Sequence, residues 1–222
     1  PDKQHGIIFN NIMFSIHRLA SFYRDVVVKG EGLGLVETMC RKTDGLPEID
    51  LKPDNAIQYD PWYNEEVGWL SILGYETCLI DPDTSFGSYK WIPTVDFTNG
   101  TLSVSESGSC DQYALSWASN INNQWYVGLS VNVPTLSYTK HISLYEAYRD
   151  NSAELRSMYH ASGVGVGGSV GLIYRPVQGL RVGASFQTPT VMMLSVQTEG
   201  DMYSAINGVN YEYLTPASGV IY

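Results

Sequence analysis

Charged side chains are scarce in this chain of 222 residues. Asp, Glu, Lys and Arg together account for 16% of it, whereas about a quarter is usual in globular domains. Basic residues are the rarer kind, with 13 Lys and Arg against 23 Asp and Glu and a net charge of −10. Nucleic-acid binding is therefore excluded, because it needs clustered basic side chains to meet the phosphates. Sixteen of the acidic residues and six of the basic ones lie between Arg24 and Asp111, so the rest of the chain is neutral overall.

Long apolar runs are also missing. No stretch approaches the roughly 18 residues that a membrane-spanning helix needs, and no signal peptide is recognised at the start, Pro1. We therefore expect an internal piece of a larger protein. The lack of a helical span leaves barrel strands open as a membrane structure, because each needs only about 10 alternating residues.

Three cysteines are too few for a disulfide framework. Cys40, Cys78 and Cys110 have neither a Cys-x-x-Cys pattern nor the spacing of a metal site. The odd count favours free thiols, and a bridge between Cys40 and Cys78 is the alternative in an oxidising compartment. We expect no metal site and no cofactor.

Strict alternation of apolar and small polar residues begins after Asp111. Apolar side chains take every second position in four segments, Tyr113–Trp117, Trp125–Val133, Val164–Tyr174 and Leu180–Phe186. Only a strand places every second residue on one face. The short turns NINNQ and RPVQG join these segments in pairs, so the sequence predicts two β-hairpins.

The polar faces of these strands carry Gly, Ser, Asn and Gln in place of charges. Within residues 112–133, 160–174 and 180–198 the only Asp, Glu, Lys or Arg is Arg181. A soluble sheet would expose charged side chains, whereas a membrane barrel presents an apolar face to lipid and a mildly polar face to its lumen. We therefore predict barrel strands, with a soluble β-sandwich as the alternative. The positions expected to face the lumen are Gly163, Gly165, Gly167, Arg181 and Gln187.

The whole chain, residues 1–222, is predicted to be one partial β-barrel domain of the all-β, antiparallel class. Residues 19–109 are expected to form a long, acidic, extracellular loop region within it. Short helices are expected there near residues 33–42 and 64–73, because Pro- and Asp-rich stretches separate these two segments. Residues 110–198 are expected to hold the two clear hairpins.

The connections between strands are expected to alternate in length. Further long loops are expected at residues 137–159 and 200–208, on the side opposite the two short turns, as in outer-membrane barrels. Trp and Tyr residues near the short turns match an interfacial aromatic girdle. About five strands can be counted, with a sixth starting near Leu214.

Two strings that usually indicate enzymes occur on the Gly-rich strand. Gly163–Gly168 reads G-x-G-x-x-G, but no helical pattern follows it and no acidic residue lies about 20 positions on. Gly167–Gly171 reads G-x-S-x-G, but the alternation continues through Ser169, so the sharp turn that exposes a nucleophile is missing. We predict a barrel wall and no enzyme. A barrel-embedded lipase or acyltransferase, built from a Ser and a His distant in sequence, is the alternative.

The segment GLIYRPVQGLRVGASFQTPT (Gly171–Thr190) resembles the hairpin of FadL/TodX-type outer-membrane transport proteins of the Bacteroidetes-like branch. Three further segments are similar to parts of that family, namely Ile121–Thr139, Leu73–Pro82 and Tyr211–Pro216. The resemblance implies a transmembrane barrel of fourteen strands in the outer membrane of a Gram-negative bacterium. It also implies an N-terminal plug with an Asn-Pro-Ala string, which this sequence lacks.

The same resemblance implies passive uptake of long-chain fatty acids or other hydrophobic compounds, with outer-membrane lipid around the barrel. An entering ligand would leave water for an apolar groove in the long loop. The candidate groove residues are Trp62, Trp69, Leu70, Ile72 and Leu73. Packing of the loop helices against the barrel rim is the other interpretation of these residues. A protein partner at the acidic loop, or a shuttle role in type IX secretion without lipid transport, is the alternative function.

Overall fold

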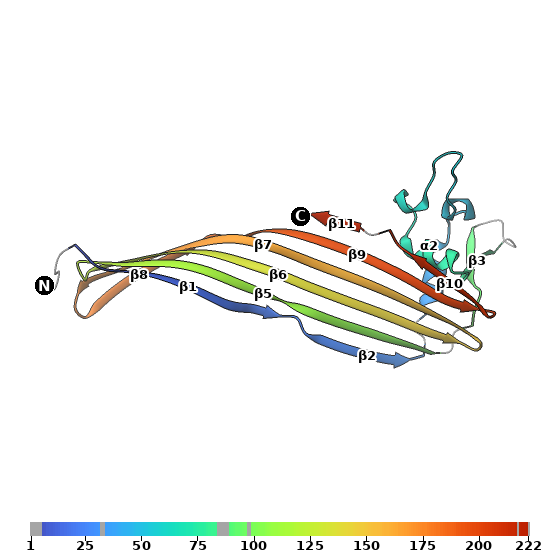
Figure 1. Ribbon diagram of the computed structural model, residues 1–222, viewed down its shortest axis with the longest axis horizontal. Helices are drawn as coiled ribbons and strands as arrows, with labels where there is room; N and C mark the ends of the chain where they lie inside the picture. The colour runs from blue at the N-terminus through green and yellow to red at the C-terminus, as the bar shows by residue number, and fades with distance from the viewer. Residues whose placement is uncertain (1–5, 32–33, 84–88, 97–98, 217, 222) are drawn as a thin grey trace.

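The computed structural model describes residues 6–31, 34–83, 89–96, 99–216 and 218–221. One antiparallel sheet runs along the long axis, and a module of short elements, here called the loop module (residues 34–83 and 89–96), lies at one end (Figure 1). The sheet consists of β1 (Ile7–Ser21), β2 (Arg24–Gly30), β5 (Asn99–Ile121), β6 (Trp125–Tyr148), β7 (Asn151–Val177), β8 (Leu180–Gln187), β9 (Val191–Ile206), β10 (Val209–Leu214) and β11 (Ser218–Ile221). The loop module consists of α1 (Leu35–Thr43), η1 (Glu48–Leu51), η2 (Pro61–Tyr63), α2 (Trp69–Glu76), β3 (Ile80–Asp83) and β4 (Lys90–Pro93).

The order of the strands in the sheet follows the chain. β5, β6 and β7 form the middle of the sheet. On one side, β1 and β2 pair one after the other with β5, and on the other side, β8 and β9 pair one after the other with β7. β10 and β11 both pair with β9. Among the described residues β1 and β10 do not pair with each other, so the sheet is open. The predicted all-β, antiparallel class is confirmed. A strand was expected to start near Leu214; β10 ends at that residue, and β11 begins shortly after it, at Ser218.

The long strands extend further than the sequence indicates. The loops expected at residues 137–159 and 200–208 are instead the ends of two hairpins, because β6, β7 and β9 continue through these residues. Asn207 and Gly208 have φ of 51° and 79°, as in the tight turns that suit β-hairpins. The prediction was wrong there because Ser, Thr and charged residues replace apolar members of the alternation, which weakens the period-two signal.

The acidic loop region is narrower than the expected residues 19–109. β2 continues to Gly30 and β5 begins at Asn99. Both expected helices are present as α1 and α2, shifted toward the C-terminus by a few residues. Leu33, at the start of the first expected helix, lies outside the described residues.

One register holds along the full length of the long strands, from β5 through β6 and β7 to β9. Each side chain can therefore be assigned to one of two faces over the whole sheet, because successive residues of a strand point to opposite faces. The face that carries the loop module, here the module face, includes Ser130 and Ser169. The opposite face, here the bare face, includes Leu129 and Val170.

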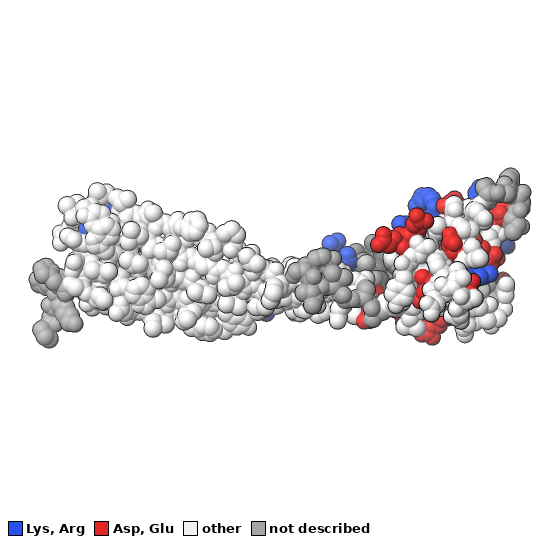
Figure 2. Space-filling view, turned by 90° about the horizontal axis from the view of Figure 1, so that it is seen from above, with Lys and Arg blue, Asp and Glu red and all other residues white. Residues whose placement is uncertain are grey.

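Toward the short turns the bare face is apolar and exposed. Phe14 and Val191 are 62% and 69% exposed, and their neighbours are similar. This apolar zone consists of Ile12, Phe14, Ile16, Tyr113, Leu115, Trp117, Leu129, Val131, Val164, Val166, Val170, Val182, Phe186, Val191 and Met193. At its turn end the rings of Trp125 and Tyr174 stack, with centroids 4.1 Å apart. None of these positions is charged, and coloured atoms in Figure 2 crowd the module end while the strand half is almost uniformly white.

A row of serines ends the apolar zone. The register places five serines side by side on consecutive strands of the sheet, at Ser21, Ser109, Ser137, Ser162 and Ser195. We call this line the serine row. Because these residues share the bare face with the apolar zone, the row is a sharp border between an apolar and a polar surface.

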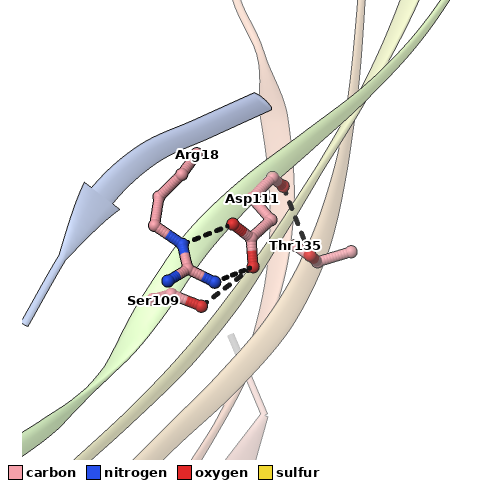
Figure 3. A network of polar contacts seen from close by, with 4 residues as sticks. All are labelled: Arg18, Ser109, Asp111 and Thr135. Atoms are coloured by element: carbon pink, nitrogen blue, oxygen red, sulfur yellow. Dashed lines mark hydrogen bonds and ion pairs between the residues drawn. The ribbon is translucent and has the colours of Figure 1, made fainter. Parts of the chain in front are cut away.

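An ion pair lies on the bare face at the same border (Figure 3). The Nε atom of Arg18 lies 2.8 Å from Oδ1 of Asp111, and the hydroxyl of Ser109 donates to Oδ2 at 2.9 Å. The hydroxyl of Thr135 donates to the backbone carbonyl of Asp111 at 3.2 Å. The Arg18 side chain is 55% exposed, and exposed pairs contribute only about 0–1 kcal/mol to stability. The ion pair is informative through its position, because Asp111 is next to Ser109 of the serine row on the bare face of β5.

Toward the short turns the module face carries mostly small and polar side chains, although Phe9, Met13 and Ile173 are exposed apolar residues on it. The hydroxyls of Ser116 and Ser130 are hydrogen-bonded at 2.8 Å. Beside them is a groove of about 510 Å³, whose floor includes a row of small residues in register across four strands, Ala118, Gly128, Gly171 and Ser185. The five positions predicted to face the lumen, Gly163, Gly165, Gly167, Arg181 and Gln187, all belong to this face.

The glycines of β7 allow β9 to lie close. A Cβ at Gly163 would collide with the backbone carbonyl of Met193, and one at Gly165 would lie 2.6 Å from Cγ of Met192. The space beside these two glycines is therefore occupied by β9. This is the close backbone approach for which strand interiors use glycine.

We expect Gly163→Ala to lower the free energy of unfolding by about 1–3 kcal/mol, the usual cost of overpacking. The new methyl group would meet a backbone carbonyl, which cannot rotate away as a side chain can. Gly171→Ala, on the same strand and face, is the control and should change stability by less than about 0.5 kcal/mol, since a Cβ there has nothing within 4 Å. Urea unfolding followed by Trp fluorescence measures both, and equal effects would contradict this packing.

Candidate functional site

The loop module shares one hydrophobic core with the sheet. α1 and α2 pack together, and the β3–β4 pair packs beside α1. The largest buried side chains of the module are Met39, Leu51, Ile72, Leu73, Leu79, Ile80 and Trp91. The core continues into the module face of the sheet through Tyr148, Ala153, Met202 and Ile206. Module and sheet are therefore one packed unit.

A buried carboxylate holds α1 against the sheet. Glu146 of β6 is fully buried, and its two oxygens accept hydrogen bonds from the backbone N–H of Leu35 at 2.8 Å and from the hydroxyl of Tyr148 at 2.6 Å. α1 begins after Gly34, which has no capping side chain. Glu146 takes the place of that cap, and its charge suits the positive end of the helix. Burial, and then the bond to Glu146, raises the pKa of Tyr148, so its hydroxyl remains a donor.

A second buried hydrogen bond holds the end of α2. The hydroxyl of Ser204 on β9 donates to the backbone carbonyl of Thr77 at 2.6 Å. Thr77 is the residue at which α2 ends, where helix carbonyls lack partners within the helix. Both helices are therefore attached to the sheet at their termini, one by an acceptor and one by a donor.

A cavity of about 350 Å³ lies where the module meets the sheet. The module contributes Trp62, Tyr63 and Trp69 to its wall. The sheet and the segment after β10 contribute Ser157, Thr198, Glu199, Gly200, Thr215 and Pro216. A Cβ at Gly200 would lie 3.6 Å from the ring of Trp69, an ordinary van der Waals contact, so the indole packs against β9 at this residue. Trp62 stacks on Tyr213 of β10, with ring centroids 6.3 Å apart and an angle of 13°.

The structure divides the five predicted groove residues into two groups. Trp62 and Trp69 line the cavity, and 45% of Trp69 is exposed. Ile72 and Leu73 are buried in the core of the module, and Leu70 packs against that core, as Trp62 also does. The groove and packing interpretations therefore each describe part of the set.

The cavity also includes residues that sequence reasoning missed. Ser157, Thr198 and Gly200 share the module face of β7 and β9, within segments predicted as loops or as plain strand. A glycine inside a strand can mark the close approach of another group, but a Cβ at Gly200 would make only ordinary van der Waals contacts. The sequence therefore carried no specific signal for these cavity residues.

The three cysteines are free thiols. Burial in the module core raises the pKa of Cys40 to about 11, so its reactive thiolate is rare at neutral pH. Within the described ranges, no three His, Cys, Asp or Glu side chains gather closely enough to hold a metal ion. No helix in the described part of the chain is long and apolar enough to cross a membrane.

The residues considered for nucleophilic chemistry are separated by the sheet. Ser169 lies on the module face, whereas His160 lies on the bare face, where its Nδ1 is 2.9 Å from the hydroxyl of Thr139. A serine needs a base within hydrogen-bond distance to act as a nucleophile. The geometry of Ser169 and His160 therefore gives no support to a catalytic pair.

No protein-family model, curated protein or solved structure matches this chain. The likeness to FadL/TodX-type proteins thus rests on the quoted segments. The two faces of the sheet and the cavity at the module are the structural features that bear on function.

We expect Glu146→Ala to lower the free energy of unfolding by about 2–3 kcal/mol, because the N–H of Leu35 and the hydroxyl of Tyr148 lose their buried acceptor. Limited proteolysis should then cut the loop module faster than in the unchanged protein. Glu65→Ala removes an exposed carboxylate of the same module and should have less than about 0.5 kcal/mol of effect. Unchanged protease resistance in Glu146→Ala would show that this carboxylate does not hold α1.

Proposed function

We propose that this chain is part of the wall of an outer-membrane β-barrel that takes up hydrophobic small molecules, with long-chain fatty acids as the expected ligands. The observation that carries the proposal is the apolar zone of the bare face. On β6 the zone, together with Trp125, Val127 and Val133 on the same face, covers the nine residues Trp125–Val133, which matches the roughly 9–11 residues of a membrane-crossing strand. Exposure of an uncharged, apolar surface of this size to water is unfavourable, whereas its contact with lipid acyl chains is favourable.

Both borders of the apolar zone support a membrane placement. Trp125 and Tyr174 stack on the bare face near the short turns, where barrels carry aromatic girdles. At the other border, the Arg18–Asp111 pair and the serine row suit lipid headgroups. The small hydroxyl and amide side chains of the module face, such as Ser130, suit a water-filled interior.

The proposal requires further strands. β1 and β10 are edges whose free N–H and C=O groups would have no partner in hydrocarbon. Additional strands, which we expect in the same polypeptide, would pair with both edges and close the barrel. The module face would then line the lumen, with the loop module at its mouth.

The cavity at the module is the proposed entry point for the ligand. Trp62 and Trp69 offer an apolar wall, and Ser157 and Thr198 offer hydroxyls on the sheet side. A fatty acid has the same division between an apolar chain and a polar head. From the cavity the ligand would continue along the module face toward the short turns, without energy input.

The surface of the loop module favours a second candidate function. Residues 34–96 carry 12 Asp and Glu against 4 Lys and Arg, and acidic atoms are frequent at this end in Figure 2. Ile49, Ile57 and Tyr63 are 67%, 73% and 85% exposed. Exposed apolar side chains among acids suit a basic protein partner. This would fit a surface-binding or type IX shuttle-like barrel that does not transport lipid.

A lysine on each face tests the membrane placement. We expect Val170→Lys to destabilise the folded protein in lipid vesicles by about 2–4 kcal/mol, because the ammonium group would lie near the middle of the hydrocarbon. Ser169→Lys is the matched control, since the neighbouring residue points to the opposite face, and it should cost about 1 kcal/mol or less. Urea titration of the full-length parent protein in vesicles, read by heat-modifiable gel mobility, measures both. Equal costs would mean that the bare face does not contact lipid.

Fatty-acid binding tests the entry cavity. The full-length parent protein in detergent is titrated with labelled palmitate, with heat-unfolded protein as the blank. Trp69→Asp should raise the Kd about tenfold or more, a loss of roughly 1.4 kcal/mol, because it removes the indole and places a carboxylate against the apolar chain of the ligand. Ile57→Asp, exposed on the same module and away from the cavity, should leave the Kd unchanged.

The two candidate functions give opposite results in this experiment. Saturable binding that Trp69→Asp weakens and Ile57→Asp does not would support uptake through the cavity. Absence of saturable binding by a demonstrably folded protein would overturn the transport proposal and favour the protein-binding one.

A further inference from the structure

Beyond the serine row the bare face changes from apolar to hydroxyl-rich. On β5 every second residue in this direction is Ser or Thr, namely Ser109, Ser107, Ser105, Ser103 and Thr101. Thr139 and Ser143 continue the pattern on β6. We call the bare face from the serine row to the module end the hydroxyl zone. Hydroxyl groups both donate and accept hydrogen bonds, so they can bind neutral polar groups.

Two hollows lie in the hydroxyl zone. The first, of about 350 Å³, is lined by Ser105, His141, Ser143, Arg156 and Asp201, among others. The second, of about 410 Å³, is lined by Tyr145, Glu154, Tyr203 and Glu212, among others. Donors, acceptors and aromatic rings thus converge from β5, β6, β7, β9 and β10 on one face.

The side chains between the two hollows are held in place by one another. Arg156 donates two hydrogen bonds to the carboxylate of Glu154, at 2.8 and 2.7 Å, and its guanidinium lies 4.9 Å from the ring centre of Tyr203. The hydroxyl of Ser143 donates to the same carboxylate at 2.9 Å. A site whose side chains are already ordered loses less entropy when a ligand binds.

We infer that the hydroxyl zone binds the sugar headgroup of a glycolipid whose acyl chains lie against the apolar zone. The inference rests on the proposed function, since a membrane is what would bring such a lipid to this face. Ser105 lies four residues beyond Ser109 of the serine row, roughly 13 Å further along the strand. When the acyl chains of a lipid lie against the apolar zone, its headgroup sugars would lie beside Ser105. This continuity of one face, from acyl chains to sugars, selects a glycolipid over a free sugar.

The chemistry of the zone suits sugar hydroxyls better than phosphate. Arg156 is already paired with Glu154, and Asp201 and Glu199 add negative charge beside it, which would repel a phosphate group. Carboxylates and hydroxyls accept and donate the bonds that sugar hydroxyls offer. Tyr145 is 43% exposed and presents a ring against which the C–H face of a pyranose can pack. Binding should therefore depend weakly on salt.

The test compares two lipids with the same lipid A part, that is, the same acyl chains and the same lipid A phosphates. The full-length parent protein is inserted into phosphatidylcholine vesicles that contain either rough lipopolysaccharide, which has core sugars, or lipid A, which lacks them. After detergent extraction, the protein should retain the core-bearing lipid about fivefold more than lipid A, roughly 1 kcal/mol. The preference should persist from about 50 to 500 mM salt, over which exposed ionic contacts are screened.

Variants connect the preference to named side chains. Asp201→Asn and Arg156→Gln should each reduce the preference about threefold or more, as expected for one lost hydrogen bond to a charged group. Asp96→Asn, on the exposed surface of the loop module, is the matched control and should keep it. The unfolding temperature of each variant in detergent shows whether it is folded.

The outcomes separate this inference from the proposed function. Equal retention of the two lipids by an inserted protein would overturn the glycolipid site and leave the membrane placement intact. Failure of the unchanged protein to insert, measured by protease protection, would overturn both. Binding of free core oligosaccharide as tight as that of the lipid-linked form would reassign the hollows to a soluble sugar and overturn the glycolipid assignment.

Discussion

The constant register between β5, β6 and β7 determines which side chains of this protein meet the loop module and which stay bare. These strands contain 23, 24 and 27 residues and pair without a slip. A slip of one residue would exchange the two faces of a strand and mix Leu129 and Val170 with Ser130 and Ser169. The register shifts occur instead where the outer strands pair, between β1 and β5 at Ile7/Phe9 and Arg18/Ala20 and between β7 and β8 at Tyr174/Val177. Strand structure is also interrupted between β8 and β9.

The same register places the loop module. Glu146, Tyr148 and Ser204 lie on the face that carries small polar residues near the turns, so the hydrogen bonds to α1 and α2 bring the module onto that face. The bare face is then free of it along its length. The same strand pairing thereby places the uncharged apolar zone and the hydroxyl zone on the bare face and the charged loop module on the opposite face.

The sequence predicted the strands correctly where large apolar residues alternate clearly with small polar ones. Between Tyr113 and Val133 large apolar residues alternate with Gly, Ser and Asn, and the predicted hairpin is present. In residues 137–159 Ser and Thr occupy one face and charged residues appear on both, so strand was mistaken for loop. Trp62 and Trp69 were identifiable as apolar residues of a polar loop. Their partners were not, because the contacts that set the site join residues more than 100 positions apart, such as Leu35 with Glu146.

The character of the cavity follows from how the module is attached. The acidic residues of the module lie mostly away from the sheet, and the carboxylate that enters the interface, Glu146, is fully hydrogen-bonded and buried. The remaining contact is made by rings, with Trp62 on Tyr213 and Trp69 over Gly200. An apolar wall from the module therefore faces a polar side that comes from the strands, with the hydroxyls of Ser157 and Thr198 and the acidic residue Glu199. A molecule with an apolar chain and a polar head fits that arrangement better than either a purely apolar or a highly charged one, because each part finds surface of its own kind.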